Sequence, residues 1–225
     1  MSKTAIILGS SGLTGGLVLE KLLKDDRYTE IKLFSRSASQ LNHPKVKEHI
    51  IDLFELEKSA DLFMADEVYC CIGTTKKKTP NKEVYHQIDY GIPVAAAKLC
   101  ALNSINTYLV VSAMGAKKTS SIFYNRTKGE MEEAVLEQKI KNTFILRPAL
   151  ITGDRNEKRA GEQFFAGMFS FFNLLLFGPL KKYRSIKAER IAEAMVRLAN
   201  RPVDKSIIES GEIQLIADEE SSTNP

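Results

Sequence analysis

Three regularly spaced glycines near the start of the chain restrict its fold more than any other feature. The stretch ILGSSGLTGG places Gly9, Gly12 and Gly15 after the apolar run Thr4–Leu8 and at the start of the amphipathic segment Leu13–Leu23. In a strand–turn–helix unit, the first glycine permits a tight turn, the second admits a phosphate close to the backbone, and the third lets helix and strand pack closely. This context favours a dinucleotide site over the alternative, an ordinary turn.

The residues around these glycines suit an anionic ligand. A helix that begins here offers free backbone N–H groups and the positive end of its dipole to a phosphate. The segment lacks the Gly-Lys-Ser/Thr ending of a P-loop and does not match the Gly-x-Ser-x-Gly turn of a hydrolase. Besides the glycines, we predict that the cofactor contacts Ser10, Ser11, Leu13 and Thr14.

Short apolar runs alternate with helical patterns as far as Pro148, which predicts an α/β fold with a doubly wound parallel sheet, the Rossmann fold. After Pro148 we expect a small C-terminal helical cap. We interpret residues 1–217 as a single domain and residues 218–225 as a disordered tail. The predicted strands are Thr4–Leu8, Ile31–Phe34, Val46–Ile50, Val68–Ile72, Thr107–Val111, Thr143–Leu146 and a short one near Glu212–Ile216; the predicted helices are Leu13–Leu23, Leu56–Phe63, Ile88–Leu102, Phe123–Gln138 and one near Lys187–Asn200.

Composition excludes several classes of function. Lys plus Arg number 32 against 28 for Asp plus Glu, without a long basic block, so no nucleic-acid partner is implied. The three cysteines are odd in number and favour buried thiols of a reducing compartment. The N-terminal residues show no signal-peptide pattern, and we expect a cytoplasmic protein. The histidines lack neighbours at metal-ligand spacing, so no metal is predicted for His43, His49 or His86.

The end of the second predicted strand bears on the choice between NAD and NADP. A carboxylate there bonds the ribose 2′-hydroxyl, whereas an arginine accommodates a 2′-phosphate. The sequence Phe34-Ser35-Arg36-Ser37 has the arginine, which favours NADP. After the third strand, Asp52 and Leu53 suit either the adenine ring or, for Asp52, a plain helix cap.

Three residues in the second half of the chain have the chemistry for proton transfer. Ser112 follows the run Thr107–Val111, and Tyr124 and Lys128 lie four residues apart, on one face of a predicted helix. An ammonium near a phenol stabilises the phenolate and lowers the pKa of the phenol. We therefore predict Ser112 as the group that holds the substrate oxygen, Tyr124 as the acid/base and Lys128 as its activator.

Five motifs together resemble the atypical short-chain dehydrogenase/reductase superfamily, in the branch typified by Tat-interacting proteins. In order they are GSSGLTG, CCIGTT, SAMGA, YNRTKGEMEE and LRPALITGDRNEKRAGE, within residues 3–202. The resemblance implies NADP as cofactor and the triad Ser112, Tyr124 and Lys128. It also implies that Gly73 and Thr74 lie along the cofactor and that Arg147 flanks the nicotinamide pocket.

One departure from the superfamily concerns the helix after the fourth strand. Many members have an asparagine there that relays protons, where this chain has Ile88-Asp89-Tyr90. The interpretation is an NADP-dependent oxidoreductase that transfers a hydride between the nicotinamide and a carbonyl or alcohol. The alternatives are an NADP-binding, redox-sensing regulatory protein and an epimerase or dehydratase that uses bound NAD transiently.

A phenylalanine-rich stretch, FFAGMFSFFNLLLFG, follows the predicted site. It is shorter than the roughly 20 apolar residues that span a bilayer, so no transmembrane segment is expected. Phe165, Phe169 and Phe172 share one face if the stretch is helical. It then forms part of the core, a lid over a hydrophobic small-molecule substrate, or the contact of a homodimer, protein partner or membrane surface.

Overall fold

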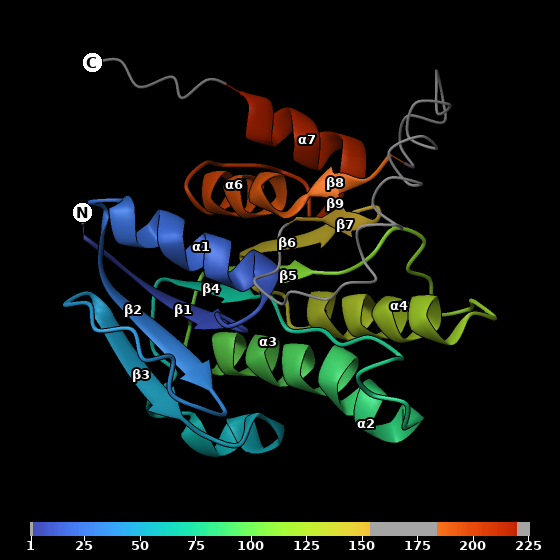
Figure 1. Cartoon of the computed structure of the whole chain (residues 1–225), viewed down its shortest axis with the longest axis horizontal. Coiled ribbons are helices and arrows are strands. Elements are labelled where there is room, and N and C mark those ends of the chain that lie inside the picture. Colours follow the sequence, from blue (N-terminus) through green and yellow to red (C-terminus); the bar gives the residue numbers. More distant parts are fainter. Residues whose placement is uncertain (1, 154–183, 220–225) are drawn as a thin grey trace, which may run out of the picture.

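A seven-stranded parallel sheet organises the chain in a computed structural model, which describes residues 2–153 and 184–219 (Figure 1). The order across the sheet is β3-β2-β1-β4-β5-β6-β9, so the winding direction reverses between β1 and β4. In doubly wound sheets, ligands bind at such a reversal, beyond the carboxyl ends of the strands. The strands are β1 (Lys3–Leu8), β2 (Tyr28–Ser35), β3 (Val46–Ile50), β4 (Glu67–Cys70), β5 (Thr107–Val111), β6 (Asn142–Arg147) and β9 (Ile207–Glu209); β7 (Ile151–Thr152) and β8 (Ile186–Lys187) form a separate parallel pair.

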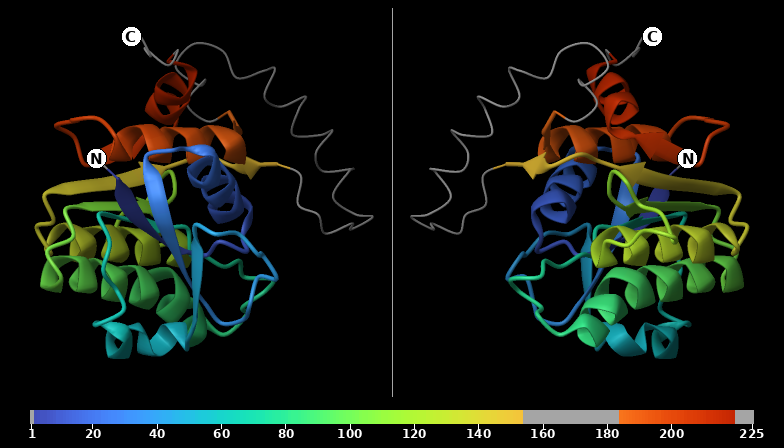
Figure 2. Two further views of the ribbon diagram at one scale, coloured as in Figure 1. Left: turned by 90° about the vertical axis from the view of Figure 1, so that its left-hand side faces the viewer. Right: turned by 90° about the vertical axis from the view of Figure 1, so that its right-hand side faces the viewer.

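Helices cover both faces of the sheet, as the doubly wound fold requires (Figure 2). On one face lie α1 (Leu13–Lys24) and α6 (Ala188–Ala199), with α7 (Ser210–Asp218) packed on α6. The opposite face carries the 3₁₀ segment η1 (Leu53–Ser59), α3 (Ile92–Leu102) and α4 (Phe123–Leu136). Ahead of α3 come α2 (Lys82–His86) and the π-helix η2 (Gln87–Gly91).

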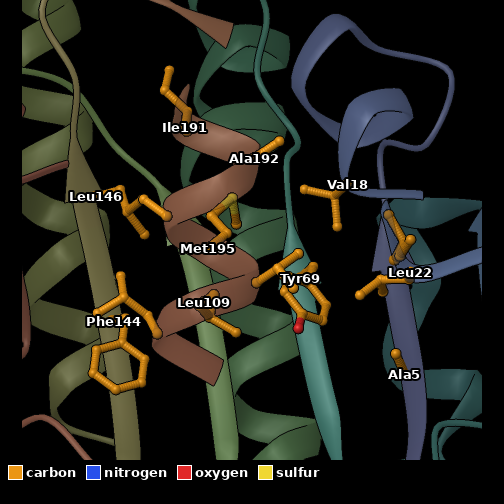
Figure 3. Packing of buried hydrophobic residues seen from close by; sticks show 14 of the residues in the cluster. Ala5, Val18, Leu22, Tyr69, Leu109, Phe144, Leu146, Ile191, Ala192 and Met195 are labelled. Carbon is orange, nitrogen blue, oxygen red and sulfur yellow. The ribbon is translucent and has the colours of Figure 1, made fainter. Parts of the chain in front are cut away.

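Alternation along the strands supplies the two halves of the core. In β1, Ala5 and Ile7 face the α1/α6 layer, whereas Ile6 and Leu8 face the α3/α4 layer. All four are fully buried, which is typical of a parallel strand covered on both sides. Figure 3 shows α6 laying its apolar side chains over β4, β5 and β6. The C-terminal helices therefore complete one face of the core.

The predicted strand near Glu212–Ile216 is wrong, because this segment forms helix α7. Its residues read as an alternating strand, yet Ile213, Ile216 and Ala217 are also spaced three and four apart, and these are the side chains that α7 buries. The side chain of Glu209 accepts from the N3 backbone while Glu212 accepts from the Glu209 N–H, which is a capping box. The last sheet strand is instead β9.

The predicted helix Ile88–Leu102 begins earlier and contains a wide turn. Asn81 caps α2 by accepting hydrogen bonds from two backbone N–H groups, and the π-helix η2 joins α2 to α3. Pro93 lies in the first turn of α3 and cannot donate to the carbonyl of Asp89, four residues earlier. A π turn here accommodates the proline ring without breaking the helix. Likewise, the predicted helix Leu56–Phe63 is replaced by η1, which is kinked at Glu55.

Two predicted features lie outside the described residues. These are the phenylalanine-rich stretch, including Phe165, Phe169 and Phe172, and residues 220–225 of the expected tail. The first residue of that tail, Asp218, ends helix α7. Within residues 2–153 and 184–219, no helix combines the length and apolarity needed to span a membrane.

Candidate nucleotide-binding active site

The glycine loop between β1 and α1 has no room for side chains at two of its positions. Gly9 has φ +87°, and a Cβ there would stand 2.9 Å from the carbonyl oxygen of Cys71. A Cβ on Gly15 would lie 2.1 Å from the carbonyl oxygen of Gly9. Larger residues would push α1 away from the ends of β1 and β4, so these glycines set the distance between helix and sheet.

The N-terminus of α1 presents backbone N–H groups without a side-chain cap. Its N-cap is Gly12, whose own N–H is bonded to the carbonyl of Gly9 at 3.0 Å. The first turn contains no acidic residue, and Ser11 and Gly12 are exposed. Leu13 is half-buried and Thr14 buried. An uncapped helix start with exposed residues in front of it fits the phosphates of a dinucleotide.

The residues predicted for the adenosine end lie beyond neighbouring strands. Ser35 is paired with Ile50 across β2 and β3, so Arg36 and Asp52 follow adjacent strand ends at one edge of the sheet. The side chain of Arg36 is exposed and forms no ion pair with any described residue. It is therefore free to meet an anion.

Asp52 and Leu53 are engaged within the protein. The Asp52 carboxylate accepts a hydrogen bond from the N–H of Phe54 at 2.9 Å and caps η1, as one of the two interpretations expected. Leu53 is buried in the core, whereas Phe54 and Ile50 are 48% and 52% exposed. The sequence argument missed these two side chains, although the alternation around Leu53 was a signal that Phe54 faces the other way. Ile50 ends β3 opposite Ser35, the residue that precedes Arg36.

Tyr124 and Lys128 lie one turn apart on α4, and Lys128 reaches the carboxyl edge of the sheet. Lys128 is 3% exposed, and its ammonium lies 2.9 Å from the carboxylate of Asp89. It also donates to the carbonyl of Val111, the last residue of β5, at 3.4 Å. Tyr124 is 39% exposed, with its ring edge-on to Tyr85 at 6.5 Å. The helix thus holds the Tyr124 phenol partly open to solvent and the Lys128 ammonium buried.

The electrostatics of this pair differ from the sequence expectation. Burial raises the pKa of the Tyr124 phenol; the Lys128 ammonium lowers it and the Asp89 carboxylate raises it again, so that it lies above its usual value. For Lys128, burial lowers the pKa of the ammonium, but Asp89 and Tyr124 more than offset this and leave it raised. Tyr124 is therefore protonated and Lys128 charged at neutral pH.

Asp89 is the site residue whose role the sequence argument did not identify. Its carboxylate is 1% exposed, and its second oxygen accepts from the N–H of Thr74 at 2.8 Å. A Cβ on Gly73 would lie 3.5 Å from this carboxylate and 4.0 Å from the Lys128 ammonium. Gly73, Thr74, Asp89 and Lys128 are thus brought together. The available signal was the aspartate itself, on the helix after the fourth strand, where the resemblance to the superfamily implies an asparagine.

Ser112 and Arg147 belong to a second buried cluster, centred on Glu132. The Ser112 hydroxyl is 3% exposed and donates to Glu132 at 2.5 Å. Arg147 pairs with the same carboxylate and with Glu209 at 3.0 Å. Glu132 follows Tyr124 by eight residues on α4, a rise of about 12 Å. The structure therefore keeps Tyr124 and Lys128 one turn apart on α4 but directs the Ser112 hydroxyl to Glu132, two turns from Tyr124.

Of the other candidates, the cysteines and the lysine run show no reactive arrangement in the part of the chain that the structure describes. Burial raises the pKa of the Cys70 thiol, which fits a core residue and not a reactive thiolate. Lys76, Lys77 and Lys78 are exposed in the loop after β4. Among the described residues, no three His, Cys, Asp or Glu side chains gather as metal ligands.

Comparisons with known proteins show the family of this chain. The profile of the NAD(P)H-binding family matches residues 9–202. Protein HTATIP2 of Rattus norvegicus is 30% identical over 165 residues, which cover 72% of this chain and 68% of that protein. The mitochondrial protein FMP52-2 of Scheffersomyces stipitis is 28% identical over 214 residues, covering 92% of this chain and 91% of that one.

Solved structures share the fold at low sequence identity. UDP-glucose 4-epimerase of Thermotoga maritima, solved with UDP-glucose, superposes with a TM-score of 0.69 at 14% identity, over 96% of this chain and 84% of that chain. The Bordetella bronchiseptica enzyme WbmH, solved with NAD+, gives a TM-score of 0.67 at 14% identity, over 93% and 76%. These likenesses show the Rossmann architecture.

Proposed function

Because the chain belongs to the NAD(P)H-binding family, in the atypical short-chain dehydrogenase/reductase branch, we propose that it is an NADP-dependent oxidoreductase that interconverts a carbonyl compound and its alcohol. The observation that carries this proposal is the pair formed by Tyr124 and Lys128 at the carboxyl edge of the sheet, together with the uncapped start of α1. An acid/base beside a dinucleotide site is what hydride-transfer chemistry at a carbonyl requires.

The proposed cofactor contacts follow the strand ends in order. Phosphates would meet the loop and the first turn of α1, the adenosine 2′-phosphate would meet Arg36, and the nicotinamide end would lie along Gly73 and Thr74. Arg36 supports NADP over NAD because a guanidinium forms charge-assisted hydrogen bonds with phosphate. When bound, the reduced nucleotide supplies a hydride to the carbonyl carbon. The loop and first-turn residues are Gly9, Ser10, Ser11, Gly12, Leu13, Thr14 and Gly15.

The chain's own residues supply the proton. In the reductive direction, the Tyr124 hydroxyl donates its proton to the substrate oxygen, and the Lys128 ammonium stabilises the phenolate that remains. The raised pKa of Tyr124 keeps the phenol protonated, which is the form that reduction uses. For Ser112 to hold the substrate oxygen as well, its hydroxyl must exchange Glu132 for the substrate.

The test combines binding with turnover. Calorimetry should show tighter binding of NADPH than of NADH, and loss of nicotinamide absorbance should reveal turnover on a panel of aldehydes, ketones and quinones. Tyr124→Phe should keep nucleotide affinity and lose turnover by about a hundredfold or more, because proton transfer contributes that much. Parental turnover in Tyr124→Phe would refute the catalytic assignment.

A second candidate function is an NADP-binding, redox-sensing regulatory protein. The buried position of Ser112 favours it, because a hydroxyl donated to Glu132 is withdrawn from any substrate. This candidate predicts nucleotide binding with a conformational or partner-binding difference between NADP and NADPH, and no turnover on any carbonyl of the panel. The epimerases among the structural neighbours share only the fold with this chain and add no third candidate.

The cellular setting is part of the proposal. We propose residues 1–217 as a single nucleotide-binding unit acting on a small molecule. The cytoplasm is the predicted compartment, and the mitochondrial name of the fungal relatives is the alternative that cell fractionation would test. Light scattering on the purified chain would test the possible homodimer.

A further inference from the structure

Asp89 occupies an unusual position for a charged side chain. It lies in the π-helix η2, ahead of Pro93, with 1% of its side chain exposed. Both carboxylate oxygens are used, one by the Lys128 ammonium at 2.9 Å and the other by the Thr74 N–H at 2.8 Å. The carboxylate therefore joins three elements: the wide turn of η2, the turn after β4 and the helix α4.

Stability alone does not explain this buried pair. Removing two charges from water costs about as much as their attraction returns, and apolar replacements of buried pairs are often neutral or stabilising. The pair instead fixes the position of the Lys128 ammonium. Lys128 carries four flexible side-chain carbons, yet its ammonium is held between Asp89 and the carbonyl of Val111, one helical turn from Tyr124.

We propose that Asp89 is a positioning residue for the reaction proposed above: one oxygen fixes the Lys128 ammonium beside the Tyr124 phenol, and the other fixes the Gly73–Thr74 turn against it. The inference rests on the proposed function. A 1 Å displacement of a reacting group lowers rates by up to about a hundredfold, so an anchor for Lys128 has a catalytic consequence without touching the substrate.

The charge of Asp89 can be detected through the pKa of Tyr124, because the other titratable groups nearby are neutral. The titratable groups that face Asp89 and Lys128 are Tyr85 of α2, Cys70 of β4 and Tyr124 of α4. Burial raises the pKa of Tyr85 and Cys70, so both are neutral at physiological pH. The charges acting on the phenol are thus those of Lys128, which lowers its pKa, and Asp89, which raises it.

The experiment uses Asp89→Asn in the full chain, which preserves the shape and removes the charge. The pKa of Tyr124 is read from ultraviolet phenolate difference spectra, with Tyr124→Phe in each background to isolate this tyrosine. We expect the pKa of Tyr124 to fall, the pH profile of alcohol oxidation to move to lower pH, and kcat on its plateau to fall about tenfold with a smaller change in KM.

Glu67→Gln is the matched control. Glu67 is also a buried carboxylate paired with a lysine, but it lies at the opposite end of β4. This control should lower stability and leave both the Tyr124 titration and kcat unchanged. If Asp89→Asn behaved in the same way, the positioning role would be overturned.

Asp89→Glu provides a second variant if Asp89→Asn does not fold. It keeps the buried charge but moves it by one methylene, so kcat should fall while the pKa of Tyr124 stays raised; an unchanged kcat would overturn the proposal. Failure of the proposed function is distinguishable, because an inactive parent protein would still show the shift in the Tyr124 titration.

Discussion

The two ends of strand β4 place similar chemistry in different surroundings. At the amino end, Glu67 is 2% exposed and accepts hydrogen bonds from Lys3 at 2.5 Å, Tyr28 at 2.7 Å and Tyr69 at 2.8 Å. Beyond the carboxyl end, Asp89 accepts from Lys128 and the Thr74 N–H. Both carboxylates are buried and both are paired with a lysine.

The two clusters differ in whether a neighbouring polar group remains accessible to solvent. At the amino end, Asn200 donates to the Tyr28 hydroxyl at 2.7 Å and accepts from Lys3 at 2.8 Å, so the cluster ties β1, β2 and β4 to the end of α6. At the carboxyl end, Lys128 stands behind a half-exposed Tyr124, in the same edge of the sheet as the uncapped start of α1. At the amino end the buried ion pair joins elements of the fold, whereas at the carboxyl end we propose that it supports the binding site.

The same substitution at the two lysines should separate these roles most strongly. Lys128→Met leaves Asp89 without its counterion in a site where the lysine is 3% exposed, and we expect a loss of about 3–4 kcal/mol in the free energy of unfolding, with weaker nucleotide binding. Lys3→Met should cost about 1 kcal/mol, because Lys3 is 29% exposed and Glu67 keeps two tyrosine donors. Urea unfolding and calorimetry measure both quantities.

Equal losses in the free energy of unfolding for Lys128→Met and Lys3→Met would contradict the difference that we infer between the two ends of β4. Weaker nucleotide binding in folded Lys3→Met would contradict it more directly, since the amino end is on the side of the sheet away from the glycine loop.

Strand β2 allows the comparison to be repeated with arginines. Arg36→Asp, beyond its carboxyl end, should weaken NADP by about thirtyfold and NAD much less, because it replaces a cation available for the 2′-phosphate by a carboxylate. Arg27, just before β2, pairs with Asp25, and Arg27→Asp should change neither affinity. Titration calorimetry with both nucleotides decides the matter; equal losses for NADP and NAD in Arg36→Asp would refute the 2′-phosphate assignment.

Ser112→Ala tests whether the Glu132 cluster stabilises the fold, like the Glu67 cluster, or takes part in the proposed reaction. The Ser112 hydroxyl is bonded to a buried carboxylate that also holds Arg147, much as Glu67 holds its tyrosines. We expect a loss of about 1.5 kcal/mol in the free energy of unfolding and less than about a tenfold change in turnover. A hundredfold loss of turnover at unchanged stability would instead place Ser112 on the substrate.

The sequence predicted the fold well wherever one periodicity dominated. The six sheet strands from Thr4 to Leu146 and their parallel arrangement were predicted correctly. The inner strands β1, β4, β5 and β6 read as continuous apolar segments because they are largely buried on both faces, whereas the edge strand β3 is only partly buried. The segment Glu212–Ile216 was misread as a strand because it satisfies both a strand and a helix spacing, and only contact with α6 decides between them. The π turn that contains Asp89 comes just before Pro93, and the helical spacing of this segment does not distinguish a π turn from an α turn.

For the site, the spacing of residues along the sequence predicted which side chains share a face of one helix. It did not predict which side chains from different elements come into contact. Tyr124 and Lys128 share a face of α4 because they are one turn apart. Lys128 and Glu132 are also four apart, so the sequence alone does not tell which of these side chains meets Ser112. Asp89 approaches Lys128 only through the packing of η2 against α4. The catalytic role of Ser112 stays a prediction.

The smallest expected effect concerns Asp52, at the carboxyl edge beyond β3. Asp52→Ala should lower the free energy of unfolding by about 1 kcal/mol, because it removes the cap of η1, and should leave nucleotide affinity unchanged. Asn81→Ala is the matched control, since Asn81 caps α2 in the same way, through the N–H groups of Glu83 and Val84.

Both caps are exposed side chains at the start of short helical segments, so equal losses in urea unfolding are the expected outcome. A fall in nucleotide affinity for Asp52→Ala but not for Asn81→Ala would show that the Asp52 carboxylate also reaches the adenine. Asp52 would then both cap η1 and bind the ligand. One side chain would combine the stabilising role of the amino-end cluster with the ligand-binding role proposed for the carboxyl end. Unchanged affinity would limit Asp52 to the cap of η1, through its hydrogen bond from the N–H of Phe54.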